Sequence, residues 1–446
     1  MPGSHRQRPG VAGRAVPIVT VALMAALATT VSQASGATTQ RVNVSSSGQQ
    51  ATGGSYDTPA ISANDRYVAF SSPASNLVVG DTNRRTDVFV RDRITRTTHR
   101  LSVSGSGAQA TSSSFGPAIS ATGLMVAFSS SATNLLAGDT NGRLDVFVRN
   151  RAAGSTHRVS VSSHGRQANG SSLNVAMSAK ARYVVFQSSA SNLVRGDTAG
   201  NDDIFVRDVV AGTTRRLSVS THGAQANADS AHPAISADGR YVVFDSFASN
   251  LVPGDSNGRE EVFVHDRVTG QTHLLSISSR GVQGALDSEL PVISGDGRYV
   301  AFDTRSGNLV PGDTNNKYDV FLRDRGTGTT RRVSVASDGT QGDRESGHFR
   351  RPSISAHGRF IAFQSWASTL VSGDTNSDTD VFIRDIGLGT TERVSVSSAG
   401  AQATGESFAA AISADGRCVG FDSTAGDLVA DDTNGAVDVF LRARLR

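Results

Sequence analysis

The strongest constraint on this chain is a segment that returns seven times along it. Its first copy, residues 80–92, has the sequence Gly-Asp-Thr-Asn-Arg-Arg-Thr-Asp-Val-Phe-Val-Arg-Asp. The leading aspartate recurs at steps of 58, 58, 58, 58, 61 and 58 residues. Seven copies at a nearly fixed period indicate seven copies of one structural unit, so the repeat decides the fold before any single residue is interpreted.

Each unit is predicted to contain four short strands, because short apolar or alternating segments are separated by turn residues. A turn such as Asp238-Gly239 between the first two strands suits a tight hairpin, since glycine adopts a positive φ without strain. Phe70 and Phe89 recur in every unit and are expected to pack between neighbouring sheets. The four predicted strands of the first copy are 59–62, 67–70, 87–91 and 100–103.

Four antiparallel strands in each of seven units predict an all-β fold, a seven-bladed β-propeller of four-stranded antiparallel blades. The last copy stops at Arg446 after its third strand, 438–441, and the missing strand is present near the N-terminus at 41–44. An N-terminal outer strand that completes the last blade closes the ring and hides its edges. The predicted propeller therefore covers residues 35–446 in 58-residue repeats.

Residues 1–34 have the features of a secretory signal. Arg6, Arg8 and Arg14 provide a basic start, an apolar run covers 15–31, and small residues follow it. An uncleaved anchor is the alternative. We expect the mature protein to be secreted and extracellular, or associated with the cell envelope, without stable membrane insertion once the signal is cleaved.

The charge balance argues against a nucleic-acid partner. The chain holds 43 Lys and Arg against 40 Asp and Glu. Removal of the three signal arginines leaves 43 − 3 = 40 basic residues, which equals the acidic count. Nucleic-acid binders carry a basic patch, and this composition does not indicate one.

We expect a monomer with a protein or glycan partner.

Residues 233–244, Pro-Ala-Ile-Ser-Ala-Asp-Gly-Arg-Tyr-Val-Val-Phe, are followed by a recurring Asp/Glu-Val-Phe-Val-x-Asp segment. This combination resembles the TolB-like, WD-like propeller repeat over about residues 38–446. The resemblance implies a propeller that serves mainly as a binding or scaffolding surface. We expect this chain to lack the N-terminal α/β domain of TolB, and no Gly-x-Ser-x-Gly hydrolase segment follows the ring. Fold alone does not assign a function.

The repeated Asp-Thr-Asn-x-x-x-Asp loop is a candidate calcium site. Its oxygen-bearing side chains at positions 1, 3 and 7 resemble the spacing of calcium-binding loops. The alternative is structural, because Asp and Asn side chains also fix turns by bonding nearby backbone N–H groups. The candidate metal ligands are Asp81, Asn83, Asp87, Asp139, Asn141, Asp145, Asp313, Asn315, Asp319, Asp374, Asn376, Asp380, Asp432, Asn434 and Asp438.

The repeat loses its symmetry at one place, where the 61-residue step adds three residues to the loop 342–351. Trp366, the only tryptophan, is expected on the same face. Aromatic rings beside Arg, His and carboxylate groups suit a sugar or a peptide, whereas ordinary loop variation is the alternative. The candidate ligand-binding residues are Asp245, Phe247, Asp303, Arg305, His348, Phe349, Arg350 and Trp366.

These features favour an exported, non-enzymatic binding or scaffold module for a protein or glycan, with calcium as the candidate ion that orders its loops. The sequence predicts no catalytic residue, because no zinc spacing or nucleophile stands out. The alternative is an extracellular carbohydrate-active enzyme, a glycosidase or lyase, that pairs carboxylates on this face among Asp245, Asp303 and Asp422.

Overall fold

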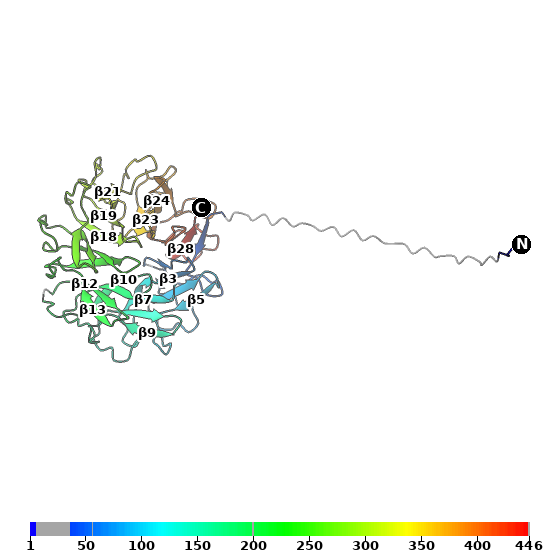
Figure 1. The fold of residues 1–446 in the computed structure, drawn as a ribbon, viewed down its shortest axis with the longest axis horizontal. Helices are drawn as coiled ribbons and strands as arrows, with labels where there is room; N and C mark the ends of the chain where they lie inside the picture. The colour runs from blue at the N-terminus through cyan, green and yellow to red at the C-terminus, as the bar shows by residue number, and fades with distance from the viewer. Residues whose placement is uncertain (6–35, 56, 199, 445–446) are drawn as a thin grey trace. The chain divides into compact units, whose positions relative to one another are not determined.

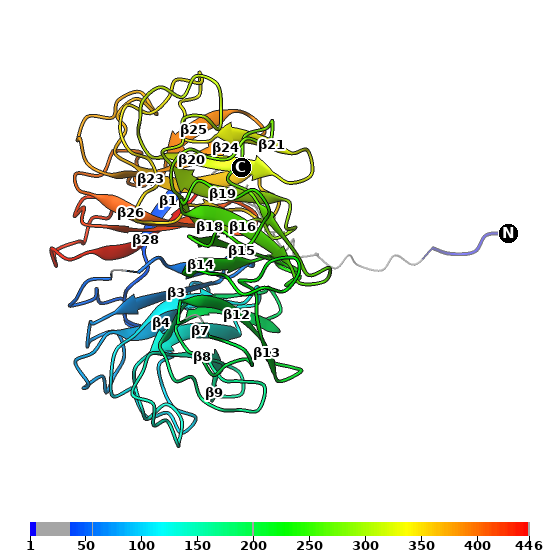
Figure 2. The ribbon, with the colours of Figure 1, turned by 90° about the vertical axis from the view of Figure 1, so that its left-hand side faces the viewer.

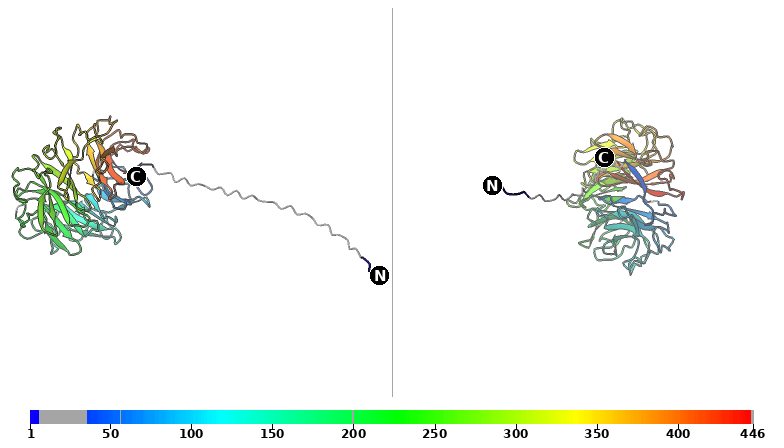
Figure 3. Two further views of the ribbon diagram at one scale, coloured as in Figure 1. Left: turned by 45° about the horizontal axis from the view of Figure 1, so that its top comes forward. Right: turned by 90° about the vertical axis from the view of Figure 1, so that its right-hand side faces the viewer.

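The computed structural model describes residues 1–5 and 36–444, apart from 56 and 199. The chain divides into two units, Met1–Ser35 and Gly36–Arg446. The predicted signal, 1–34, lies outside the described residues beyond its first five. Within the second unit, seven four-stranded antiparallel sheets surround a common axis, and their colours follow the chain order from blue through green to red (Figures 1 and 3). The predicted seven-bladed propeller is confirmed.

The first four blades follow one another along the chain, and each runs from an inner to an outer strand. Blade 1 contains β2 (Ala60–Ile61), β3 (Tyr67–Ser72), β4 (Asp87–Asp92) and β5 (Thr97–Arg100). Blade 2 contains β6 (Ser114–Ile119), β7 (Met125–Ser130), β8 (Asp145–Asn150) and β9 (Ser155–Arg158). Blade 3 contains β10 (Ser172–Met177), β11 (Tyr183–Ser188), β12 (Asp203–Asp208) and β13 (Thr213–Arg216). Blade 4 contains β14 (Ser230–Ile235), β15 (Tyr241–Ser246), β16 (Glu261–Asp266) and β17 (Gln271–Leu274).

The remaining three blades repeat this order, and the last one takes its outer strand from the beginning of the ring. Blade 5 contains β18 (Ser288–Ile293), β19 (Tyr299–Thr304), β20 (Asp319–Asp324) and β21 (Thr329–Arg332). Blade 6 contains β22 (Ser353–Ile354), β23 (Phe360–Ser365), β24 (Asp380–Asp385) and β25 (Thr390–Arg393). Blade 7 contains β26 (Ser407–Ile412), β27 (Cys418–Ser423), β28 (Asp438–Ala443) and β1 (Thr38–Arg41).

Ring closure by the N-terminal outer strand is confirmed. Strand β1 pairs antiparallel with β28, from Thr38 opposite Ala443 to Arg41 opposite Phe440. The blue β1 and the red β28 lie side by side in Figure 2. Arg41 Nη1 lies 3.2 Å from Asp432 Oδ1 and 3.0 Å from Asp438 Oδ2, so a charge pair joins the two ends of the ring.

The outer strands differ in position from the prediction. Residues 100–103 and 41–44 were expected to form them, but β5 and β1 end where those segments begin. Ser102 explains the difference in blade 1, because its Oγ accepts the Val88 N–H at 3.1 Å and donates to Asp87 Oδ1. A serine side chain thus takes the place of the backbone partner that a longer strand would supply.

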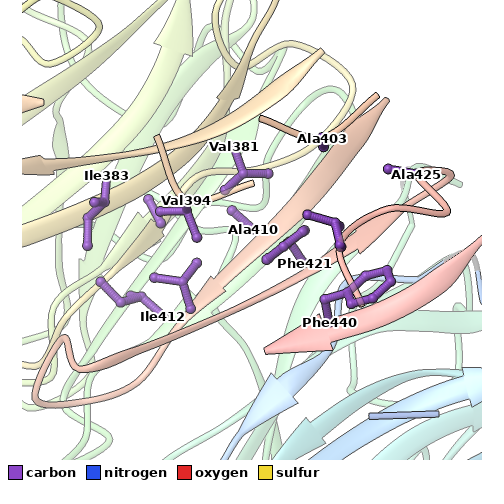
Figure 4. Packing of buried hydrophobic residues seen from close by; sticks show 12 residues of the cluster. Val381, Ile383, Val394, Ala403, Ala410, Ile412, Phe421, Ala425 and Phe440 are labelled. Atoms are coloured by element: carbon purple, nitrogen blue, oxygen red, sulfur yellow. The ribbon is translucent and has the colours of Figure 1, made fainter. Parts of the chain in front are cut away.

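The core consists of aromatic and aliphatic side chains between neighbouring blades. Phe70 and Phe89 lie with ring centroids 5.7 Å apart, both fully buried, and every blade repeats this stacked pair. Each hydrophobic cluster combines residues of two blades, as Figure 4 shows for Val381 of blade 6 with Phe421 and Phe440 of blade 7. A blade therefore buries its apolar faces only when its neighbours are present.

In five blades the left-handed position of the hairpin between the first two strands is glycine, whereas Asp65 (φ 57°) and Ala181 (φ 56°) occupy it in blades 1 and 3. Gly123 has φ of +73°, and a Cβ there would lie 2.1 Å from the Tyr67 ring of the preceding blade. The same close approach joins Gly239 to Tyr183 and Gly297 to Tyr241. The turn glycine therefore serves both the hairpin and the contact between blades.

We expect a chain that starts at Val42 to be less stable than one that starts at Gly36. The shorter chain loses β1, with its backbone hydrogen bonds at about 1 kcal/mol each, and it leaves Asp432 and Asp438 without their guanidinium partner. Urea unfolding should show a loss of roughly 3 kcal/mol or more, and size-exclusion chromatography should show association through the bare β28 edge. Equal midpoints and elution volumes for the two chains would contradict ring closure by β1.

Candidate functional site

Two families of loops share one end of the blades, which we call the upper face. The antiparallel order places the start of each inner strand, the end of the second strand and the start of the third strand at this end. The long loops between second and third strands, and the connections between blades, therefore meet there. The loop 342–351 and Trp366 belong to this face, as predicted from the repeat.

The inner strands carry a bulge near the upper face. Strand β18 shifts its register against β19 between Glu289 and Val292, and Leu290 within the bulge has φ of 57°. This geometry turns the Leu290 N–H toward the preceding blade, where it donates to Asp245 Oδ2 at 2.8 Å. The His348 N–H likewise donates to Asp303 Oδ2 at 3.0 Å.

Asp245 and Asp303 are therefore acceptors that join neighbouring blades. Both side chains lie at the upper end of their strands, the face that the sequence predicted, but they are fully buried. Burial raises the pKa of Asp303 well above its ordinary value. In the next blade Gln364 takes the same place and accepts the Ala409 N–H at 3.4 Å. An amide at this position shows that the contact needs an acceptor and not a charge.

The three-residue insertion builds a stack of rings. His348 lies 4.0 Å from Tyr318 between ring centroids, at 15° between planes, and 3.7 Å from the Phe349 ring, which is tilted by 46°. His348 Nδ1 lies 3.3 Å from Glu289 Oε1, which ties the stack to blade 5. The guanidinium of Arg305 covers the Tyr318 ring at 5.4 Å. Among the described residues no other pair of blades has such a stack, and the loop 342–351 between blades 5 and 6 is the one that carries three extra residues.

The backbone of the stack is strained. His348 has φ of 51° and Phe349 φ of 68°, a region that non-glycine residues adopt rarely. Phe349 is nevertheless 73% exposed, so burial of its ring does not offset the strain. Gln364 holds the turn, because its Nε2 donates to His348 O at 3.1 Å. His348 shares its positive φ with the bulge residues Leu290 and His232, so only the φ of Phe349 is peculiar to this loop. Strain of this kind concentrates at functional sites.

A second histidine lies in the neighbouring blade. His232 Nδ1 lies 2.9 Å from Asp245 Oδ2, and His232 itself occupies the bulge of β14 with φ of 48°. Arg351 reaches from the insertion to the same strand and donates to Pro233 O at 3.3 Å. The site therefore joins the inner ends of blades 4, 5 and 6.

The electrostatics of the site are dominated by buried acids. Burial, followed by repulsion from Asp245, Glu289 and Asp287, raises the pKa of Glu260 to about 8. Burial and Glu289 also raise the pKa of Tyr318 to about 12. Burial and the neighbouring acids thus favour the protonated form of Glu260.

The structure brings together only part of the predicted ligand set. Arg305, His348 and Phe349 meet in the stack, while Phe247 is half exposed on blade 4. Arg350 lies over the Phe408 ring at 5.7 Å, on the side of blade 7. Trp366 is half-buried, and its backbone N–H donates to Glu345 O at 3.0 Å. No aromatic stack joins Trp366 to another ring in the described part of the chain.

Sequence analysis missed several residues of the site. Tyr318 occupies a place that holds Thr86 and Leu144 in the first two copies, and Glu289 one that holds Phe115. Comparison of the copies with one another at every position would have found both, whereas attention to the insertion alone did not. The residues missed are His232, Glu260, Glu289, Tyr318 and Arg351.

The repeated Asp-Asn-Asp loops form compact polar clusters. In blade 1, Asn83 Nδ2 donates to Asp87 Oδ2 at 2.8 Å, and Arg100 Nη1 lies 3.0 Å from Asp81 Oδ1 and 3.4 Å from Asp87 Oδ2. A guanidinium thus supplies positive charge between the two carboxylates. Calcium in these loops stays a prediction. The equivalent guanidinium groups are those of Arg41, Arg158, Arg216, Arg332 and Arg393.

No helix in the described ranges is long and apolar enough to span a membrane. No group of three or more His, Cys, Asp or Glu side chains among these residues is arranged to hold a metal ion.

No protein-family model and no curated protein matches this chain. Solved structures do match it. Oligogalacturonate lyase from Vibrio parahaemolyticus is 11% identical over 92% of this chain and 97% of its own, with a TM-score of 0.52. The β-propeller domain of the Trilobed protease from Pyrococcus furiosus is 9% identical over 88% and 98%, with a TM-score of 0.53.

TolB from Acinetobacter baumannii is 15% identical over 73% of this chain, with a TM-score of 0.43, and this chain spans 63% of its length. Likeness at these identities shows the fold alone. The propeller fold expected from the repeat is confirmed at that level by the two matches with TM-scores of 0.52 and 0.53.

We expect the replacement Glu260→Gln to change how stability depends on pH. The pKa of Glu260 in the folded chain, about 8, exceeds its ordinary value of 4.5. The stability that Glu260 contributes is therefore fully present below pH 4.5 and is lost as the pH rises through 8. Melting at pH 5 and pH 8.5 should show that the variant gains more over the parent at the higher pH. The exposed control Glu406→Gln should show no such difference, and equal gains at both pH values for Glu260→Gln would contradict this assignment.

Proposed function

We propose that this chain is an exported binding module whose protein or glycan ligand seats on the upper face, over the ring stack of blades 5 and 6. Phe349 carries this proposal. Its ring is 73% exposed, its backbone is strained, and it stands on His348 in the one loop that departs from the repeat. An exposed aromatic ring in a cluster that also contains the Arg305 guanidinium provides stacking and hydrogen-bonding surface for a ligand.

The role of the buried carboxylates supports a binder over a glycosidase. Asp245 and Asp303 are fully buried and accept backbone N–H groups across blade boundaries. A pair of glycosidase carboxylates must instead flank a substrate and exchange protons with it. Phe349, Arg305 and Phe247 are exposed on the upper face, and their side chains suit recognition.

A carbohydrate-active enzyme is the second candidate, and one observation favours it. His232 is held by Asp245 at 2.9 Å, and Asp245 also raises the pKa of Glu260. A histidine oriented by a carboxylate beside a protonated carboxyl group provides a base and an acid within one site. Product release from oligosaccharides that His232→Ala abolishes would establish this candidate in place of the binder.

We expect Phe349→Ala to weaken binding about tenfold or more, because truncation of a central aromatic contact costs about 1.4 kcal/mol or more. A glycan array and a peptide library would identify ligands, and calorimetric titration would compare the variants. Arg305→Ala should weaken binding in the same direction. Val268→Ala is the matched control, since Val268 is a similarly exposed apolar residue (74%) in a turn on the opposite face.

Unchanged affinity in both Phe349→Ala and Arg305→Ala, for a ligand that the parent chain binds, would contradict the proposed site. Loss of affinity in Val268→Ala alone would place the ligand on the opposite face.

A further inference from the structure

Because the seven blades repeat one structure, a difference in a single blade is easy to identify. Blade 4 differs from the other six at the end of its outer strand. In six blades the last residue of that strand is an arginine, whose Nη1 lies 2.9–3.4 Å from two aspartates. In blade 4 this residue is Leu274. The two acids persist there as Asp255 and Glu261, so blade 4 retains both negative charges without the positive one.

Glu261 is buried and only partly bonded. Its side chain is 1% exposed, and its Oε1 accepts from Asn257 Nδ2 at 2.9 Å and from Gln283 Nε2. Its Oε2 has no hydrogen-bond partner in the described part of the chain. Gln283 Nε2 also donates to Asp255 Oδ1 at 3.1 Å, so one amide joins the two acids. Glu261 occupies the place from which Asp87 faces its arginine in blade 1.

A buried carboxylate beside a second, partly buried one is costly without a counter-charge, because desolvation disfavours the ionised form and like charges repel. Burial, together with the charge of Asp255, raises the pKa of Glu261 to about 7 although Gln283 lowers it. The unpartnered Oε2 of Glu261 marks the place where this blade lacks a positive charge. In the other six blades an arginine guanidinium supplies that charge.

The surroundings supply further oxygen atoms. In blade 1 Gln109 presents Oε1 to Arg100 Nη1 at 2.8 Å, and rotation of the Gln283 amide would present the same atom in blade 4. The residue before the first aspartate also faces the guanidinium through its carbonyl, as Gly373 O does for Arg393 Nη2 at 3.1 Å. Gly254 holds this place in blade 4.

We propose that blade 4 binds a divalent cation between Asp255 and Glu261, at the place that an arginine guanidinium occupies in the other six blades. The donors are the two carboxylates, Gln283 Oε1 and the Gly254 carbonyl, and water completes the shell. An all-oxygen set of this kind suits calcium, which takes six to eight oxygen ligands at about 2.3–2.6 Å. Magnesium demands a stricter octahedron.

The test compares the parent chain with Leu274→Arg and Leu274→Met. At pH 8, addition of millimolar calcium after chelation should raise the melting temperature of the parent by about 2 °C or more. Leu274→Met should respond like the parent. Leu274→Arg restores the guanidinium that the other six blades have. Its melting temperature without calcium should therefore exceed that of the parent, and calcium should not raise it further.

Glu261→Gln provides a second variant that keeps size and hydrogen bonding but removes a charge. Glu261→Gln should lose the calcium response. If Leu274→Arg does not fold, the comparison of Glu261→Gln with the parent tests the calcium site instead. Calorimetric titration should show one calcium per parent chain. The proposal is overturned if the parent responds to pH across 7 but not to calcium, magnesium or manganese, because the acids would then share a proton. An equal calcium response in the parent and Glu261→Gln would also overturn it.

Discussion

The propeller depends on a buried guanidinium that bridges two carboxylates in almost every blade. In blade 2, Arg158 at the end of the outer strand lies 2.9 Å from Asp139 in the long loop and 3.1 Å from Asp145 at the start of the third strand. One cation thereby fixes a loop and two strands together. Two carboxylates at this depth would repel each other without it. The Asp-Thr-Asn-x-x-x-Asp loop recurs in the sequence because six of the blades use its two acids to bind such a cation.

The repeat is broken at two places, the ring stack of blades 5 and 6 and the outer strand of blade 4. The ring stack of His348 and Phe349 appears where three residues are added, and it lies against Tyr318 and Arg305, which also depart from the repeat. Blade 4 departs from the repeat in a different respect, since Leu274 removes a charge and leaves the pair of acids. The first exception creates exposed surface that suits a ligand, and the second creates a charge deficit that suits a cation.

The sequence predicted the fold well because the repeat constrains it. Period, strand number and ring closure by the N-terminal strand all follow from residues that recur at fixed steps. The bounds of the outer strands were wrong because Ser102 replaces a backbone partner with its hydroxyl, which alternation of apolar residues does not reveal. The site was predicted in part. The insertion identified His348, Phe349 and Arg350, but the burial of Asp303 was not predicted, since burial and the bulge that turns the His348 N–H toward it depend on the neighbouring blade.

The most direct test of the central claim is the unfolding free energy of Arg158→Leu, which gives blade 2 the charge deficit of blade 4. Removal of one partner from a buried ion pair leaves an uncompensated charge and costs about 3–5 kcal/mol. Burial already raises the pKa of Asp145 although Arg158 opposes it, so the loss should shrink at acid pH as the carboxyl becomes protonated. We predict a loss of this size in urea at pH 8 and a smaller one at pH 5. A change below about 0.5 kcal/mol at both pH values, as for an ordinary surface substitution, would contradict the account.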